Sequence, residues 1–493
     1  MFGLDSSAWT WIVFGAELAL RLILGLRVLM RRLDTGVTLG WLLLILSTPF
    51  VGAGLYLLVG ESRLGRRRAA REAEVESAYR QYLAIHALRS QAQQLALPRA
   101  VDRLATHAEA IGGFPALGGN AFELLDDSLE VLRRLVEDID AAEQSVHLLF
   151  YIWMPGGDAD RVVEALIRAA GRGRRCRLAL DAVGSRPFLA SPQAARLREA
   201  GVTLVPILPV GLLRLLFVRA DHRNHRKIAV IDGRLAYTGS MNLADPRYFK
   251  QDSGRFAPWV DAMLRLEGPV AEQLNLLFLH DWELETGFGL GLEELPALFE
   301  ATGLVSPLDR GTSVAQLLPS GPGLRSGVVH ELLLALIYAA RDEILITTPY
   351  FAPDSSLTLA LTSAAHRGVR LRILLPEQVD SRMVDLAGRA AFDELMEAGA
   401  EIHRFQGGLL HTKAITVDGR IALFGTANLD ARSFWLNFEL MLQILDTEVA
   451  GQIRALQLRY LKRAPRLDAE TWYRRRFRTR LAEELAQLFS PLL

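Results

Sequence analysis

The residues best suited to chemistry stand in a pattern that occurs twice in the chain. The first copy reads His225-Arg226-Lys227, then Asp232, then Gly239-Ser240-Met241-Asn242. The second copy reads His411-Thr412-Lys413, then Asp418, then Gly425-Thr426-Ala427-Asn428, with the same spacing. A lone histidine is usually a core or surface residue, but a set of six residue types repeated at fixed spacing predicts a functional site.

These residue types suit the transfer of a phosphodiester. Histidine is a nucleophile and a proton donor near neutral pH, so one imidazole can attack phosphorus while the other protonates the leaving alcohol. The groups predicted to hold the non-bridging oxygens are Lys227, Lys413, Asn242, Asn428, Ser240 and Thr426. The scheme needs no cofactor and no metal.

The segments around the two patterns also repeat, as short apolar runs that alternate with helical runs. The first copy predicts helices at 131–138 and 160–170 and strands at 146–153, 177–181 and 202–206. The second predicts helices at 328–340 and 357–366 and strands at 343–350, 369–375 and 401–405. Such alternation indicates sheets covered by helices. We therefore expect an α/β fold of two similar halves, packed so that both imidazoles reach one phosphorus atom.

Two long apolar stretches open the chain, at about 9–30 and 37–59, and each is long enough to cross a bilayer as a helix. They predict a transmembrane hairpin, because a signal peptide has one shorter apolar region. Glu17 and Arg21 are four residues apart on one helix face, where they can pair. The alternative is a buried hairpin of a soluble protein.

The flanking charges give the expected orientation. The turn between the stretches holds Arg31 and Arg32, whereas the segment that follows holds Arg63, Arg66, Arg67, Arg68 and Arg71. The more basic side should be cytoplasmic, which places the rest of the chain there. The predicted parts are a hairpin at 1–60, a helical connector at 61–110, a first half at 111–290, a second half at 291–460 and an amphipathic helical segment at 461–493.

Composition narrows the function classes. Lys plus Arg and Asp plus Glu both number 56, so the net charge is zero and nothing global favours a nucleic-acid partner. Half of the residues are apolar, which allows a large core. The single cysteine, Cys176, excludes an internal disulfide, and its apolar neighbours predict a small buried residue rather than a reactive thiol.

The duplicated pattern resembles the HKD signature of the phospholipase D superfamily, and almost the full chain resembles the bacterial cardiolipin synthases. The matching stretches are 55–61, 150–153, 223–227, 258–261, 347–354, 428–434, 437–439 and 490–493. The resemblance implies a phospho-histidine intermediate, with His225 favoured as nucleophile and His411 as acid and base.

The resemblance also assigns the carboxylates. It implies that Asp261 and Glu439 orient the imidazoles, against the alternative that both are ordinary surface residues. Asp232 and Asp418 belong to the catalytic signature, with a mainly structural part in it. One position departs from the family: Leu149 stands where a Glu or Gln is usual.

The expected reaction transfers a phosphatidyl group from one phosphatidylglycerol to another and gives cardiolipin and glycerol at the bacterial inner membrane. A phospholipase D-type lipid hydrolase with water as acceptor, or another phosphatidyltransferase, remains open. A nuclease is disfavoured by the predicted anchor and the zero net charge. A non-catalytic membrane scaffold would not need two intact motifs.

Two further apolar segments allow two interpretations each. Residues 206–218 could dip into the membrane interface or belong to the core of the first half. Residues 472–477, followed by Leu481, Leu485 and Leu488, predict a basic amphipathic helix. We expect it to pack on the catalytic body with a solvated basic face, and binding to anionic lipid headgroups is the alternative.

Overall fold

The computed structural model describes residues 6–31, 35–61, 68, 70–75, 79, 82–84, 95–210, 219, 221–247, 258–287, 310–323 and 325–490. The chain forms two compact units. An N-terminal unit comprises Met1–Ala69 and Val210–His222, and a large unit comprises Ala70–Pro209 and Arg223–Leu493. The predicted boundaries between five parts stay a prediction, since the junction of the two halves falls in 288–309, outside the described residues.

The N-terminal unit is helical. Its elements are α1 (Ser6–Met30), α2 (Thr35–Ser47), α3 (Pro49–Leu55) and the π-helical turn η1 (Tyr56–Gly60). Arg21 donates to Glu17 at 2.6 Å, which confirms the predicted pair. Glu61 is buried and accepts from Tyr56 at 2.8 Å and from Arg27 and Arg31. The carboxylate of Glu61, directly after η1, therefore links this turn to α1.

The expected transmembrane spans are not confirmed. Among the residues that the structure describes, no helix combines the length and the apolar character needed to cross a membrane. The second apolar stretch is divided at Thr48, because Pro49 begins a new helix and its ring cannot continue the previous one. The helix of the first stretch, α1, carries Glu17, Arg21 and Arg27.

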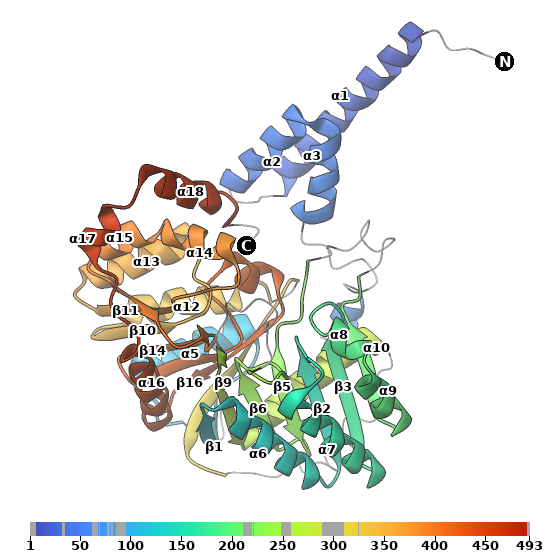
Figure 1. Cartoon of the computed structure of the whole chain (residues 1–493), viewed down its shortest axis with the longest axis vertical. Helices are drawn as coiled ribbons and strands as arrows, with labels where there is room; N and C mark the ends of the chain where they lie inside the picture. Colours follow the sequence, from blue (N-terminus) through green and yellow to red (C-terminus); the bar gives the residue numbers. More distant parts are fainter. Residues whose placement is uncertain are drawn as a thin grey trace, which may run out of the picture. The chain divides into compact units, whose positions relative to one another are not determined.

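The large unit is built on one continuous sheet. Its strand order is β12-β11-β10-β14-β15-β16-β9-β1-β8-β6-β5-β2-β3-β4 (Figure 1). The strands of the first half are β1 (Leu117–Leu125), β2 (Ser145–Phe150), β3 (Arg175–Asp181), β4 (Thr203–Ile207), β5 (Lys227–Ile231), β6 (Leu235–Gly239) and β8 (Met263–Glu267). Those of the second half are β9 (Ser313–Ser320), β10 (Glu343–Thr347), β11 (Arg370–Pro376), β12 (Glu401–Phe405), β14 (Ala414–Val417), β15 (Ile421–Gly425) and β16 (Glu439–Ile444).

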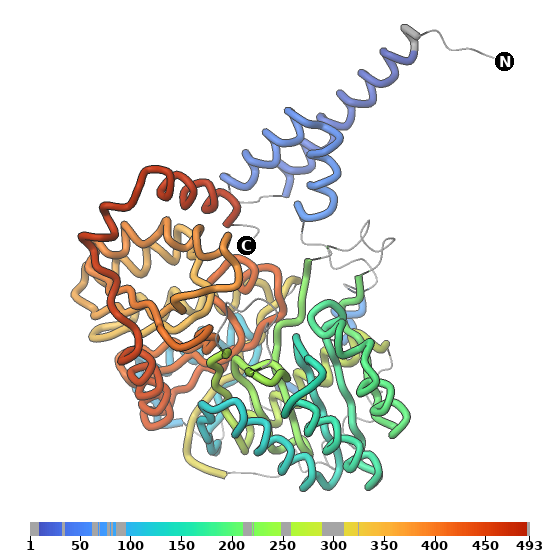
Figure 2. The backbone as a smooth tube through the Cα atoms, viewed as in Figure 1, coloured from blue at the N-terminus to red at the C-terminus, as the bar shows by residue number. Residues whose placement is uncertain are grey.

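The strand order reads the same from both ends, so the two halves repeat each other. Each half has three parallel strands at its outer edge, such as β2, β3 and β4, and antiparallel strands toward the centre. The halves join where β1 pairs with β9. Figure 2 shows the first half, in green, beside the second half, in orange. This confirms the predicted α/β fold of two similar halves.

Helices cover both faces of the sheet. On one face, α10 (Pro269–Thr286) and α16 (Thr447–Leu461) pack on strands of both halves in a shared core. On the other face each half has its own core, with α6 (Ser128–Asp140) and α7 (Asp160–Gly171) in the first half and α12 (Val328–Ala339) and α13 (Ser355–His366) in the second. Successive β2 residues alternate between the cores, as pleating requires: Leu148 faces one and Leu149 the other.

The predicted elements are found close to their expected positions. The segments predicted as helices at 131–138 and 328–340 are α6 and α12, and those predicted as strands at 177–181 and 401–405 are β3 and β12. Cys176 is buried in β3, and burial raises the pKa of its thiol to about 11. The thiol is therefore an apolar core group, as predicted.

The C-terminal segment packs on the second half. It forms α17 (Ala469–Tyr473) and α18 (Phe477–Gln487). The indole N–H of Trp472 donates to Asp393 at 2.6 Å, and Arg475 pairs with the same carboxylate and with buried Glu483. These contacts confirm the prediction that the segment packs on the rest of the large unit.

Candidate active site

Each copy of the motif is a β-hairpin, β5–β6 or β14–β15, preceded by its histidine. The hairpin turns at the motif aspartate, which has a left-handed backbone, with φ 54° at Asp232 and 53° at Asp418. Asp232 accepts from the backbone N–H groups of residues 143, 144 and 145, and Asp418 from those of 341, 342 and 343. Both aspartates therefore hold the hairpin to the start of β2 or β10.

The motif glycines are needed for the close approach of the next strand. A Cβ on Gly239 would lie 2.5 Å from the carbonyl oxygen of Ala262, and one on Gly425 would lie 2.2 Å from that of Leu440. No side chain fits at either position. Each glycine therefore allows the next strand, β8 in the first half and β16 in the second, to lie directly beside its motif.

The two halves exchange short backbone contacts around the histidines. The strand β7 (Trp259–Val260) of the first half pairs with β13 (Leu409–Leu410) of the second, and His411 N–H donates to Val260 O at 2.8 Å. In the reciprocal contact, His225 N–H donates to Phe438 O at 2.9 Å. Each histidine therefore follows a segment that is hydrogen-bonded to the other half.

This exchange places a carboxylate from one half against the histidine of the other. The Nδ1–H of His225 donates to Glu439 at 3.1 Å, and the Nδ1–H of His411 donates to Asp261 at 2.7 Å. All four side chains are buried. Because a carboxylate only accepts, the Nδ1 atoms carry the protons and the Nε2 atoms of neutral rings keep their lone pairs.

Ser240 and Thr426 are placed differently from the sequence prediction. The sequence predicts contacts to phosphate, but each hydroxyl donates to an orienting carboxylate at 2.6 Å, Ser240 to Asp261 and Thr426 to Glu439. Both are fully buried behind the histidines. Each half therefore supplies a hydroxyl and a carboxylate that together fix the imidazole of the opposite half.

Both histidines line one cavity of about 510 Å³. Asn242 and Asn428, predicted to bind phosphate, line it as well. The Oδ1 of Asn242 accepts from the N–H of Ile152 at 3.3 Å, which turns its amide N–H₂ toward other acceptors. The cavity therefore brings together one imidazole and one amide from each copy of the motif, on a site large enough for a phosphodiester head group.

Burial controls the protonation of the two imidazoles. It lowers the pKa of His225 and of His411 to about 4, more than the neighbouring carboxylates raise it. Burial also raises the pKa of Asp261 and Glu439, but their interactions with the opposite histidine and the motif lysines, including the hydrogen bond from the imidazole, outweigh it and lower both. Near neutral pH the two imidazole rings are thus neutral and lie beside two carboxylates.

The motif lysines are fully buried beside the histidines. Each Nζ donates to the backbone oxygen of its own histidine at 2.7 Å, Lys227 to His225 and Lys413 to His411. Burial lowers the pKa of Lys227 to about 8 and lowers that of Lys413 well below its usual value. A bound phosphodiester anion would favour the charged form of both lysines.

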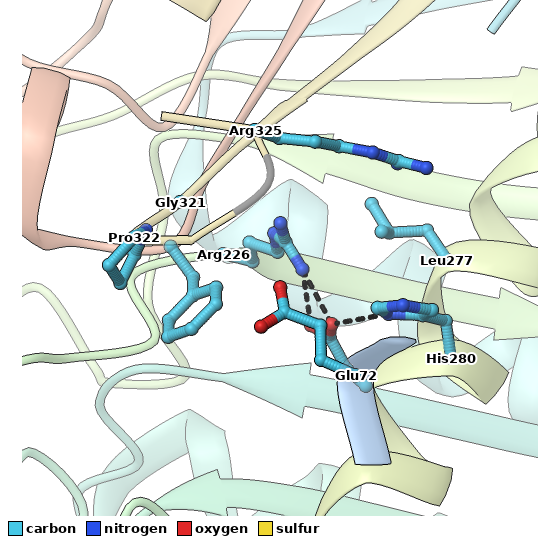
Figure 3. Close-up of a pocket in the computed structure, with 9 residues that line it drawn as sticks. Glu72, Arg226, Leu277, His280, Gly321, Pro322 and Arg325 are labelled. Carbon is cyan, nitrogen blue, oxygen red and sulfur yellow. Dashed lines mark hydrogen bonds and ion pairs between the residues drawn. The ribbon is translucent and has the colours of Figure 1, made fainter. Parts of the chain in front are cut away.

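A second, smaller pocket lies around Arg226, the middle residue of the first motif. Arg226 is buried and bonds both carboxylate oxygens of Asp281 at 2.6 Å. It also donates to the backbone oxygens of Glu439 and Ser320. Figure 3 shows its guanidinium near Glu72, His280 and Arg325. Arg226 therefore ties α10 of the first half to the strand that carries Glu439.

Sequence reasoning assigned no role to several residues of the cavity wall. They are Tyr151, Arg223, Trp259, Tyr350, Asp380, Ser381, Val384, Asp430, Arg432 and Asn437. Tyr151 and Trp259 contact the rings of His225 and His411, with centroids 4.9 Å and 4.3 Å apart. Most of these residues lie inside or beside the stretches that resemble the family, so the resemblance could have pointed to them. Asp380, Ser381 and Val384 lie outside any motif, and no pattern in the sequence marked them.

The structure places Leu149 and part of the apolar segment 206–218. Leu149 is the position where the family usually has a polar residue. Its side chain projects from β2 into the shared core and is fully buried. Of the apolar segment 206–218, residues 206 and 207 end β4, and 211–218 lie outside the described residues.

Comparisons with known proteins agree with the repeated fold. A family model described as "Cardiolipin synthase, PLD-like domain" matches residues 135–282 and 333–458, and one described as "Phospholipase_D-nuclease N-terminal" matches 19–61. The chain is 42% identical over 489 residues to "Cardiolipin synthase A" of Salmonella arizonae, and 42% identical over 491 residues to that of Edwardsiella ictaluri, covering 98% of both chains in each case. A crystal structure of phosphatidylserine synthase from Haemophilus influenzae shares the fold, with a TM-score of 0.56 and 15% identity over 79% of this chain and 100% of that one.

Proposed function

The chain belongs to the cardiolipin synthase family of phospholipase D-like proteins, and on that premise we propose that it transfers a phosphatidyl group from one phosphatidylglycerol to another. The products are cardiolipin and glycerol. The observation that carries this proposal is that His225 and His411 line one cavity, each with its Nδ1–H on a carboxylate of the other half.

In the first step the donor phosphodiester lies between the two imidazoles. The Nε2 of His225 attacks phosphorus, the bond from phosphorus to the glycerol oxygen breaks, and protonated His411 gives its proton to that oxygen. Glu439 holds the proton on Nδ1 of His225 and stabilises the positive charge that develops on the ring. Glycerol leaves, and the phosphatidyl group stays on His225.

In the second step the acceptor is a hydroxyl of another phosphatidylglycerol. His411 takes the hydroxyl proton, the new oxygen–phosphorus bond forms, and the bond from phosphorus to His225 breaks. The charged lysines and the amides of Asn242 and Asn428 stabilise the non-bridging oxygens in both steps. Burial lowers the pKa of His411 to about 4, and the negative charge of the bound phosphodiester raises it again, which allows the ring to act as an acid.

A product assay tests this function. We expect the purified full chain, given radiolabelled phosphatidylglycerol in mixed micelles, to release cardiolipin and glycerol in equal amounts. His225→Ala and His411→Ala should each abolish turnover. Asp446→Asn, which replaces one helix cap of α16 by an equally good one outside the cavity, serves as the matched control and should leave it unchanged.

Other outcomes would contradict the scheme. Phosphatidic acid as the main product would assign a hydrolase, and cleavage of an added oligonucleotide a nuclease. Near-normal activity of either histidine variant would refute a site shared by both imidazoles.

We also propose that the N-terminal unit anchors the protein in the bacterial inner membrane, with the large unit on the cytoplasmic side. Most of the large apolar side chains that the described structure exposes lie on α1, α2 and α3, among them Trp11, Leu22, Leu26 and Leu43. Exposed apolar surface of this extent on one unit is typical of a membrane-embedded segment. The excess of arginines after residue 61 supports the orientation.

A further inference from the structure

The helix α18 turns its apolar side away from the body of the large unit. Leu481, Leu485 and Leu488 have the spacing of a buried helix face, but they are 45%, 51% and 75% exposed. Phe477 extends the same stripe and is 76% exposed. The buried positions are Glu483 and Ala486, which lie on the opposite side of the helix at 100° per residue. The sequence pattern predicted the reverse.

The stripe is accompanied by positive charge. Arg476, Arg478 and Arg480 are exposed, and within the described part of the chain no carboxylate lies at ion-pair distance from any of them. The neighbouring Arg474 and Arg475 already pair with Glu470 and Glu483. An apolar stripe flanked by unpaired arginines is typical of a helix that lies in the interface of an anionic bilayer.

The position of α18 relates the stripe to the cavity. Ala486 packs with Val384 and Ala387 of α14 (Arg382–Arg389). Val384 and the residues just before α14, Asp380 and Ser381, line the cavity that holds both histidines. A membrane contact through α18 would therefore act one helix away from the wall of the reaction cavity.

We propose that α18 is an interfacial helix that docks the cavity wall on the surface of an anionic phospholipid bilayer. The membrane contact itself does not depend on the proposed function. Its role, to bring lipid head groups to the cavity, rests on that function. Phe477, Leu481, Leu485 and Leu488 enter the interface, and Arg476, Arg478 and Arg480 bind phosphate groups of the lipids.

A fluorescent label on the stripe tests the contact independently of catalysis. Cys176 is buried, so Leu485→Cys offers one accessible thiol for an environment-sensitive dye on the full chain. In vesicles of phosphatidylcholine with phosphatidylglycerol we expect a blue-shifted emission that lipid-borne quenchers suppress and that salt reverses. The matched control is Leu359→Cys on α13, which is 61% exposed and should show no shift.

Three results would overturn the proposal. These are no shift in anionic vesicles, an equal shift in vesicles of phosphatidylcholine alone, and an equal shift of the Leu359→Cys control in anionic vesicles. Arg478→Gln and Arg480→Gln should each weaken the dye's membrane contact about fivefold.

A kinetic comparison complements the dye. For Leu481→Ser combined with Leu485→Ser, we expect kcat/KM on vesicular phosphatidylglycerol to fall about tenfold or more, because apolar burial is lost. The rate on monodisperse short-chain phosphatidylglycerol should equal that of the unmodified chain. Equal loss on both substrates would show a folding defect and contradict the docking role. If neither substrate reacts with the unmodified chain, the proposed function fails while the dye result still decides the docking.

Discussion

At the scale of single residues, the chemistry depends on which nitrogen of each imidazole carries the proton. Glu439 and Asp261 fix that choice because each accepts from Nδ1 and is itself held by a hydroxyl, Thr426 or Ser240. The Nε2 lone pair of His225 is then available for phosphorus. In the proposed mechanism the two carboxylates act through the imidazoles and do not contact the substrate.

A first prediction replaces this acceptor by a group that can also donate. Glu439→Gln should lower kcat on the order of 10⁴-fold with little change in KM, because the amide permits the tautomer with the proton on Nε2. Steady-state kinetics of the purified chain measure both constants. Glu448→Gln, an exposed change in the first turn of α16, is the control. A variant that keeps a tenth of the original kcat would rule out the orienting role.

At the scale of elements, the active site depends on segments that cross between the halves. The strand pair β7–β13 and the contact of His225 with Phe438 carry each orienting carboxylate to the opposite histidine. The first half adds a second tie, in which Arg226 binds Asp281 on α10 and the backbone of Glu439 on β16. The equivalent position of the second half is Thr412, which bonds Tyr460.

A second prediction concerns this buried ion pair. Asp281→Leu or Arg226→Met alone should lower the free energy of unfolding by about 3–5 kcal/mol, because each leaves an uncompensated charged group in the core. Combined Arg226→Met and Asp281→Leu should cost clearly less than the sum. Urea denaturation of the four proteins in detergent, followed by fluorescence, measures the coupling. Additive losses would show that the two side chains do not act as a pair.

At the scale of the whole molecule, the two units differ in the surface they expose. Among the described residues, the large unit buries most of its apolar side chains in three large cores between helices and sheet. The N-terminal unit has one small core, around Val28, Ile45 and Tyr56, and leaves many apolar side chains exposed. This contrast is the physical basis for the proposal that the N-terminal unit anchors the protein in the membrane.

A third prediction tests that anchor in cells. Leu22→Arg combined with Leu26→Arg should release part of the chain from the membrane fraction, because each arginine costs about 2.5–3.5 kcal/mol at the centre of a bilayer. Both leucines are more than 60% exposed on α1. Flotation of lysates on a density gradient measures the change. Leu359→Arg, an equally exposed leucine of α13, should have no effect, and an unchanged distribution of the double variant would refute the anchor.

Features that depend on residues close together in the chain could be predicted from the sequence. Short apolar runs, helix periodicity and fixed motif spacing are local properties, so the order of helices and strands, the repeat of the halves and the residues of the two motifs could all be read from it. The candidate catalytic residues His225, His411, Asp232 and Asp418 were predicted in this way. The same spacing rule put Leu481, Leu485 and Leu488 on the wrong side of α18, because periodicity shows that a helix has an apolar face but not which surface that face meets.

The pairing of each histidine with a carboxylate of the opposite half was evident only from the tertiary structure. The crossing of Asp261 to His411 and of Glu439 to His225 depends on contacts between residues about 150 and 214 positions apart. The hydroxyls of Ser240 and Thr426 took different partners from those predicted for the same reason. Spacing along a chain does not contain such distances, which arise when two sheets join edge to edge at β1 and β9 and bury the site between them.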